Sequence, residues 1–137
     1  MTFEMQMEAL KILRPFLWDE LEDAGCNWWN DTALPFISRR NQDRAWNMGA
    51  RYFFRMDLAD ALKILMGNWN ILENRYDIEP RYFRVICHLK EARDHQAHAH
   101  RPMPSQWISY DEMALNLLRP MVEEISASRL GLAKVGG

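Results

Sequence analysis

All four histidines of this chain fall within the thirteen residues 88–100. Glu91, Arg93 and Asp94 are interleaved with them. Histidine is the side chain that changes its charge nearest to neutral pH, so this stretch concentrates groups able to exchange protons under physiological conditions. The sequence therefore places a candidate active site here, and its histidines are His88, His95, His98 and His100.

Three chemistries fit these residue types. His95 and His98, three residues apart, could share a metal ion with His100 or a nearby carboxylate. Alternatively, His98 could act as a general acid or base while Arg93 stabilises negative charge developing on a phosphate. The third interpretation is a solvated helix end, where positive charge suits the negative end of the helix dipole. The residue types alone leave all three open.

Helix geometry sets a condition on the acid–base interpretation. Successive residues of an α-helix are rotated by about 100°, so Arg93 and His98, five residues apart, point about 140° away from each other. Glu91, Asp94 and His98 instead lie along one stripe. One helix cannot direct both Arg93 and His98 at the same substrate atom unless Arg93 reaches round or the helix distorts. A second copy of the chain could complete the site across an interface.

The hydrophobic periodicity predicts an all-α protein, an up-and-down bundle of four main helices with one or two short ones. No segment shows the alternation or the turn signals of β-hairpins. We expect one domain over residues 1–130 and a flexible tail over residues 131–137. The main helices are expected over residues 2–25, 57–72, 80–99 and 110–130, with short helices within residues 26–41 and 42–54.

Local signals mark where several helices begin. Thr2 and Asp57 are expected N-caps, because their side-chain oxygens can accept hydrogen bonds from free backbone N–H groups. Ser109 with Glu112 three residues later predicts a capping box for the last helix. Gly67 lies inside a predicted helix at a cost of about 1 kcal/mol relative to alanine, which suits a position where another helix approaches closely.

Length, cysteine usage and charge narrow the class of protein. The 137 residues suit a single domain, and Cys26 and Cys87 show no metal or redox spacing. No secretory signal opens the chain and no apolar run reaches the roughly 20 residues of a membrane span, so we expect a cytoplasmic protein. The net charge is −2, but residues 32–101 hold twelve bases, ten of them arginine, against eight acids. This middle region permits nucleic-acid binding, and a solvated surface is the alternative.

The segment Arg93-Asp94-His95-Gln96-Ala97-His98 resembles the R-x4-6-H motif of the HEPN superfamily, commonly R-N-x-x-A-H. An apolar helix headed by Asp57-Leu58 and ending in Gly67-Asn68-Trp69 is similar to the Swt-type branch, found alone or at the N-terminus of large bacterial ATPases and helicases. The resemblance covers roughly residues 5–127. It includes Leu13-Arg14-Pro15-Phe16, Gly25, Trp28-Trp29 and the final amphipathic helix.

The resemblance implies a HEPN-like homodimer that cleaves RNA without a metal ion or other cofactor. Arg93 would hold the scissile phosphate, and His98 would activate the ribose 2′-OH or protonate the leaving oxygen. The products would carry 2′,3′-cyclic phosphate and 5′-OH ends. Such an endoribonuclease would serve in phage defence or as a toxin, with an antitoxin or an ATPase or helicase as partner.

One departure from the motif concerns Asp94, which occupies a position where the family often has asparagine. An acid there would repel the phosphate, or it would orient His98 four residues on and raise its basicity. His95 and His100 are not required by the motif and are supporting residues at most. The alternative function is a non-catalytic RNA-binding or dimerisation module.

Overall fold

The computed structural model describes residues 1–23, 25, 27–98 and 105–136, and for residues 95–98, 105–107 and 130–136 it describes the backbone alone. Within these ranges the chain is almost entirely helical and contains no strand, which confirms the predicted all-α bundle. No helix in the described part is both long enough and apolar enough to span a bilayer.

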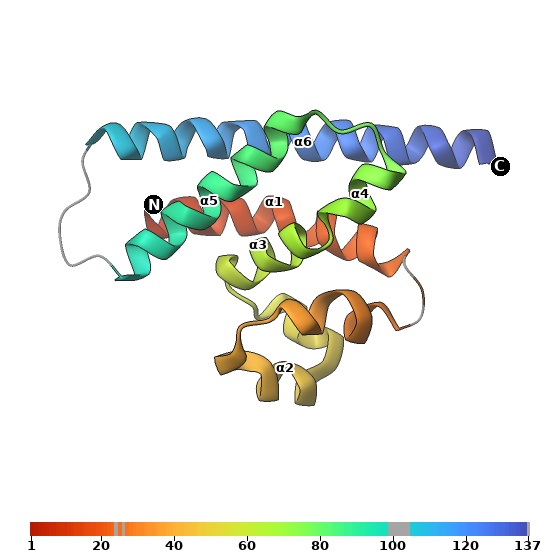
Figure 1. The fold of residues 1–137 in the computed structure, drawn as a ribbon, viewed down its shortest axis with the longest axis horizontal. Helices are drawn as coiled ribbons and strands as arrows, with labels where there is room; N and C mark the ends of the chain where they lie inside the picture. The colour runs from red at the N-terminus through yellow and green to blue at the C-terminus, as the bar shows by residue number, and fades with distance from the viewer. Residues whose placement is uncertain (24, 26, 99–104, 137) are drawn as a thin grey trace.

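Four long helices and several short ones make up the fold (Figure 1). The long helices are α1 (Phe3–Glu22), α3 (Leu58–Gly67), α5 (Pro80–His98) and α6 (Ser105–Gly136). The short helices are α2 (Gln42–Met48) and α4 (Trp69–Arg75), the π-helical turn η1 (Trp29–Ala33) and the 3₁₀ turns η2 (Leu34–Phe36), η3 (Arg39–Asn41) and η4 (Gly49–Phe54).

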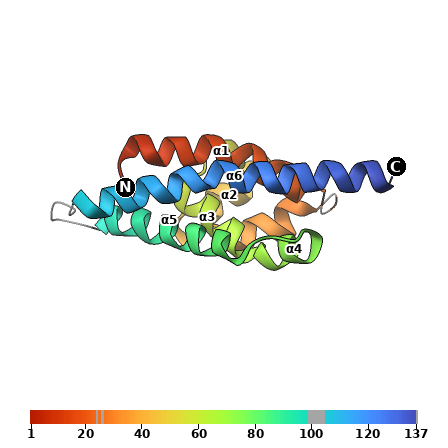
Figure 2. The same cartoon turned by 90° about the horizontal axis from the view of Figure 1, so that it is seen from above.

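The long helices α1 and α5 both pack along α6, which extends over the length of the molecule (Figures 1 and 2). The amino group of Met1 lies 3.1 Å from Asp111 and Asp23 lies 2.7 Å from Arg129, so α1 and α6 run in the same direction. The helix α5 runs back alongside them. The short elements between η1 and η4 form a separate layer below this bundle in Figure 1.

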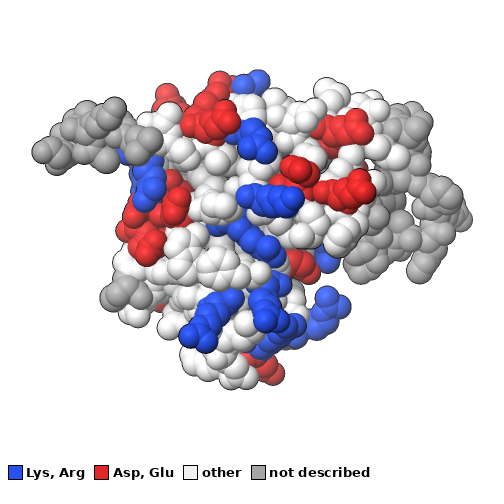
Figure 3. Space-filling model, turned by 180° about the vertical axis from the view of Figure 1, so that it is seen from behind, with Lys and Arg blue, Asp and Glu red and all other residues white. Residues whose placement is uncertain are grey.

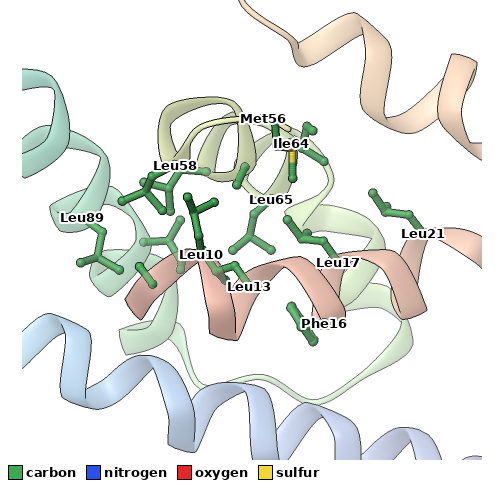
Figure 4. Close-up of a cluster of buried hydrophobic side chains, with 14 of the residues drawn as sticks. Leu10, Leu13, Phe16, Leu17, Leu21, Met56, Leu58, Ile64, Leu65 and Leu89 are labelled. Carbon is green, nitrogen blue, oxygen red and sulfur yellow. The ribbon is translucent and has the colours of Figure 1, made fainter. Parts of the chain in front are cut away.

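The central element is α3, which contacts α1, α5, η1 and η2. Seven of its ten residues are buried. Figure 4 shows Leu58 and Leu65 of α3 facing a row of leucines on α1, with Leu89 of α5 beside them. Burying a leucine side chain contributes about 1.5–3 kcal/mol, so this contact is a main source of the stability that positions α5.

Both predicted N-caps are confirmed. The Thr2 hydroxyl accepts a hydrogen bond from the backbone N–H of Met5 at 3.2 Å. The Asp57 carboxylate accepts one from the N–H of Asp60 at 3.0 Å. The start of α3 is therefore fixed by a local signal that is visible in the sequence.

The helix predicted over residues 57–72 is instead divided at Asn68. The Asn68 side-chain amide donates to the carbonyl oxygens of Thr32, at 2.6 Å, and Ile64, at 2.8 Å. The Thr32 contact joins η1 to the end of α3. The buried amide of Asn68 must be satisfied, and its bond to the distant Thr32 explains why α3 ends here although the apolar periodicity continues past residue 68.

Two other helix boundaries differ from the prediction. The short helix expected within residues 42–54 is divided at Gly49, where α2 ends and the 3₁₀ turn η4 begins, because the φ of 63° at Gly49 cannot continue a regular α-helix. The capping box of Ser109 and Glu112 is wrong, since α6 begins at Ser105 and Ser109 lies inside it. The same helix reaches Gly136, and the flexibility of residues 131–137 stays a prediction.

The position of Gly67 fits the expected close approach, although the neighbour is a turn and not a long helix. A Cβ atom added to Gly67 would overlap the ring of Phe36 in η2. We expect Gly67→Ala to lower the free energy of unfolding by about 1–2 kcal/mol, because overpacking outweighs the gain of about 1 kcal/mol in helix propensity.

Urea denaturation of Gly67→Ala in the wild-type and Phe36→Ala backgrounds tests this contact. Without the Phe36 ring, alanine at position 67 is expected to stabilise the protein by up to about 1 kcal/mol relative to glycine. If Gly67→Ala stabilises the wild-type chain, the close approach does not exist.

Candidate functional site

The residues of the R-x4-H motif lie on the last turns of α5, which is helical as far as His98. The side chains of Arg93 and Asp94 are described. His95 and His98 are described through their backbone alone, and their imidazoles lie outside the described side chains. His100 lies outside the described residues. The geometry of the candidate site is therefore the geometry around Arg93.

Arg93 has two carboxylate neighbours and a side chain that is 20% exposed. Its Nη2 lies 3.4 Å from Oδ2 of Asp57 at the start of α3, and its Nη1 lies 3.6 Å from Oδ1 of Asp94 on its own helix. The other oxygen of Asp94 accepts from the Nζ of Lys90. The guanidinium is thus directed toward α3 within a small group of alternating charges.

The contact between Arg93 and Asp57 gives Asp57 two functions. One carboxylate oxygen caps α3 through the N–H of Asp60, and the other pairs with Arg93. The sequence predicts the cap, because a cap is a local pattern. The ion pair joins residues 36 positions apart, and a single sequence contains no signal for it.

The next acid of α3, Asp60, is fully buried. It accepts hydrogen bonds from the backbone N–H of Ser38 at 3.1 Å, the side-chain amide of Asn41 at 3.2 Å and the hydroxyl of Tyr52 at 3.1 Å. Burial raises the pKa of Tyr52, and the negative charge of Asp60 raises it further. Asp60 therefore fixes the layer of short elements to the same turn of α3 that holds Arg93.

His88, the first histidine of the predicted stretch, belongs to a different contact. Its Nε2 lies 3.0 Å from Oδ1 of Asp111 on α6, and the other oxygen of Asp111 lies 3.1 Å from the amino group of Met1. This arrangement joins α5, α6 and the start of α1. His88 has a structural contact here, about one and a half turns before Arg93 on α5.

The metal-site interpretation gains no support from the described side chains. No group of three His, Cys, Asp or Glu side chains suited to a metal ion occurs among them. The histidine set on which that interpretation depends, His95, His98 and His100, lies outside the side chains that the structure describes.

A second cluster of titratable groups surrounds Glu20, which is 4% exposed. Its carboxylate accepts hydrogen bonds from the Tyr76 hydroxyl, at 2.9 and 3.0 Å, and lies 3.2 Å from Nη1 of Arg75. Burial raises the pKa of Glu20, while burial and the bond to Glu20 raise the pKa of Tyr76 to about 12. Since both groups are satisfied by each other, this cluster joins α1 to α4 and has a structural role.

Comparisons of the chain with protein-family models, curated proteins and solved structures give no match. The motif on α5 and the residues around it are therefore the features of this chain that bear on its function. The described geometry adds one feature to the motif, the attachment of Arg93 to the first turn of α3.

Two substitutions separate the functions of Asp57. Asparagine also caps helices, so Asp57→Asn removes only the partly buried ion pair and should change the free energy of unfolding by about 1 kcal/mol. Asp57→Ala removes the cap as well and should cost about 1 kcal/mol more than Asp57→Asn. Urea denaturation measures both, with the exposed Asp43→Asn as a control. Equal losses in the two variants would mean that the cap contributes nothing.

Proposed function

We propose that the protein is a metal-independent endoribonuclease that acts as a homodimer through Arg93 and His98. The observation that carries the proposal is the R-x4-H motif on the last turns of a long helix in an all-α bundle, with its arginine held against α3 by Asp57. A guanidinium with a defined orientation suits a phosphate, because its planar fork donates two parallel hydrogen bonds.

The regular helix of α5 supports a site shared by two chains. It continues without interruption from Pro80 to His98, so the rotation of about 140° between Arg93 and His98 applies to the backbone that carries them. Arg93 is directed toward α3 by Asp57. A symmetric pairing of two bundles brings Arg93 of one chain to His98 of the other, which removes the angular difficulty.

The proposed reaction is an internal transfer of the phosphoryl group. The ribose 2′-oxygen attacks the adjacent phosphorus, a P–O2′ bond forms and the P–O5′ bond breaks. The 2′-OH proton passes to a neutral histidine, and the leaving 5′-oxygen takes a proton from a protonated one. Within one centre a single His98 fills both roles in turn, first as the neutral base and then as the protonated acid, while Arg93 of the other chain stabilises the charge on the pentacoordinate phosphorus. The products carry 2′,3′-cyclic phosphate and 5′-OH ends.

A second candidate is a non-catalytic RNA-binding or dimerisation module, and one observation favours it. Arg93 has the carboxylates of Asp57 and Asp94 near it, and both must be displaced or shared when a phosphate binds. Partial neutralisation weakens the attraction of Arg93 for an anion. A non-catalytic module of this kind would serve a larger ATPase or helicase. The endoribonuclease would serve in phage defence or as a toxin in the cytoplasm, restrained by an antitoxin.

Cleavage of a labelled single-stranded RNA in excess EDTA tests the enzyme. The wild type should produce cyclic phosphate ends. His98→Ala should lower the rate by about 10²- to 10⁴-fold and Arg93→Ala by about 10²- to 10³-fold, from loss of proton transfer and of charge stabilisation. Arg84→Ala, an exposed arginine on the same helix, is the matched control and should keep full activity. Equal rates for the wild type and His98→Ala would refute the proposal.

Asp94→Asn distinguishes the two effects that Asp94 can have, repulsion of the phosphate and orientation of His98. Its carboxylate is already engaged by Lys90 and Arg93, so we expect its charge to act mainly against the phosphate. The substitution should tighten RNA binding about fivefold, equivalent to roughly 1 kcal/mol, as measured by fluorescence anisotropy with the His98→Ala chain. With His98 intact, a rate that falls tenfold or more would instead show that Asp94 orients His98.

A further inference from the structure

The layer of short elements below the bundle exposes a dense group of cations. Residues 39–55 contain five arginines and one acid, Asp43, which gives this segment a net charge of +4 in a chain whose net charge is −2. All five arginines are exposed. Figure 3 shows basic side chains gathered over this layer. The arginines are Arg39, Arg40, Arg44, Arg51 and Arg55.

These arginines differ in their partners from several arginines elsewhere. Arg75, Arg93 and Arg129 each form an ion pair with a carboxylate. Within the part of the chain that the structure describes, no ion pair joins any of the five arginines of residues 39–55 to an acid. Their guanidinium groups are therefore available to an external anion.

Two large aromatic side chains are exposed among these arginines. Trp46 on α2 is 68% exposed and Phe54 at the end of η4 is 62% exposed, whereas Trp28, Trp29 and Trp69 are buried. Leaving such large apolar surfaces in water forgoes the stability that their burial would provide. Exposed aromatic rings between unpaired arginines are the combination that binds unstacked bases and their phosphates. We call residues 39–55 the arginine–aromatic surface.

Hydrogen bonds on its inner side hold the arginine–aromatic surface in place. Asp60 accepts hydrogen bonds from Ser38, Asn41 and Tyr52, and Tyr52 itself is buried. The side-chain amide of Gln42 donates to the carbonyl oxygens at 34 and 37, at 2.8 and 2.7 Å. A surface fixed by buried hydrogen bonds loses little conformational entropy when it binds a ligand.

A groove continues from this surface onto α1. It has a volume of about 410 Å³ and is mainly apolar, with the rings of Phe54 and Trp18 on its walls, 5.1 Å apart between centroids. Lys11 and Arg14 also line it, and the buried Nε of Arg14 has no hydrogen-bond partner among the described residues. Asp19 also lines the groove, and Nη2 of Arg14 donates to the carbonyl oxygen of Met56 at 2.7 Å, so what the groove mainly presents is apolar surface for a base.

We propose that the arginine–aromatic surface binds single-stranded RNA, with phosphates on its arginines and bases stacked on Trp46 and Phe54. Single strands fit best, because stacking requires bases that are free of a duplex. The choice of RNA rests on the proposed function. Residue 55 lies two positions before Asp57, the partner of Arg93, so a strand on this surface leads toward the candidate site.

The test measures binding of a fluorescein-labelled single-stranded oligouridine by anisotropy over a range of salt concentrations. His98→Ala is the parent chain, so the RNA stays intact. Trp46→Ala should weaken binding about tenfold and leave the salt dependence unchanged, and Trp46→Phe should restore most of the affinity. Arg44→Gln with Arg51→Gln should reduce the slope of log K against log salt by about 1.4, because each lost phosphate contact removes about 0.7.

The matched control is Arg84→Gln with Arg119→Gln, which removes the same charge from exposed positions on α5 and α6. It should change the slope little, and circular dichroism should show the helix content of the parent in every variant.

The inference is refuted if the control pair matches the surface pair, if Trp46→Ala binds normally, or if duplex RNA binds as tightly. RNA cleavage with binding indifferent to Trp46 would refute only this inference. Binding that depends on Trp46, without cleavage by the wild type, would refute only the nuclease.

Discussion

The first turn of α3 holds two aspartates whose contacts organise both proposed functional regions. Asp57 caps the helix and pairs with Arg93 on α5, while Asp60, three residues later, collects the hydrogen bonds of the layer that carries the exposed arginines. A buried carboxylate is tolerated only when its oxygens are satisfied, so the layer cannot shift without leaving the charge of Asp60 unpaired. Acids at this end of a helix are also favoured by its dipole.

This arrangement connects stability to the proposed chemistry. The helix α3 is buried between α1 and α5. The packing of its apolar side chains sets the position of its first turn relative to the last turns of α5. Arg93 is thereby held toward α3. In our account, two chains together supply what one helix cannot, and the arginine–aromatic surface supplies the affinity for the strand that is cut.

The sequence predicted well what depends on local patterns. Periodicity located the long helices, and side-chain chemistry identified the caps at Thr2 and Asp57. It failed where a buried polar group has distant partners: Asn68 divides a helix through Thr32, and no local pattern predicts the hydrogen bonds that Asp60 accepts from Ser38 and Tyr52. Because one sequence carries no record of spatial neighbours, the ion pair of Arg93 could not be predicted, although the importance of Arg93 was inferred from the motif.

The central claim is that two chains share each reactive centre, and mixing two inactive variants tests it most directly. Arg93→Ala and His98→Ala proteins are combined in equal amounts, allowed to exchange subunits, and assayed on single-stranded RNA in EDTA. If a centre takes Arg93 from one chain and His98 from the other, each mixed dimer has one intact centre, and about a quarter of the wild-type activity should return. A mixture that stays as inactive as its components, with subunit exchange demonstrated, would contradict the shared site.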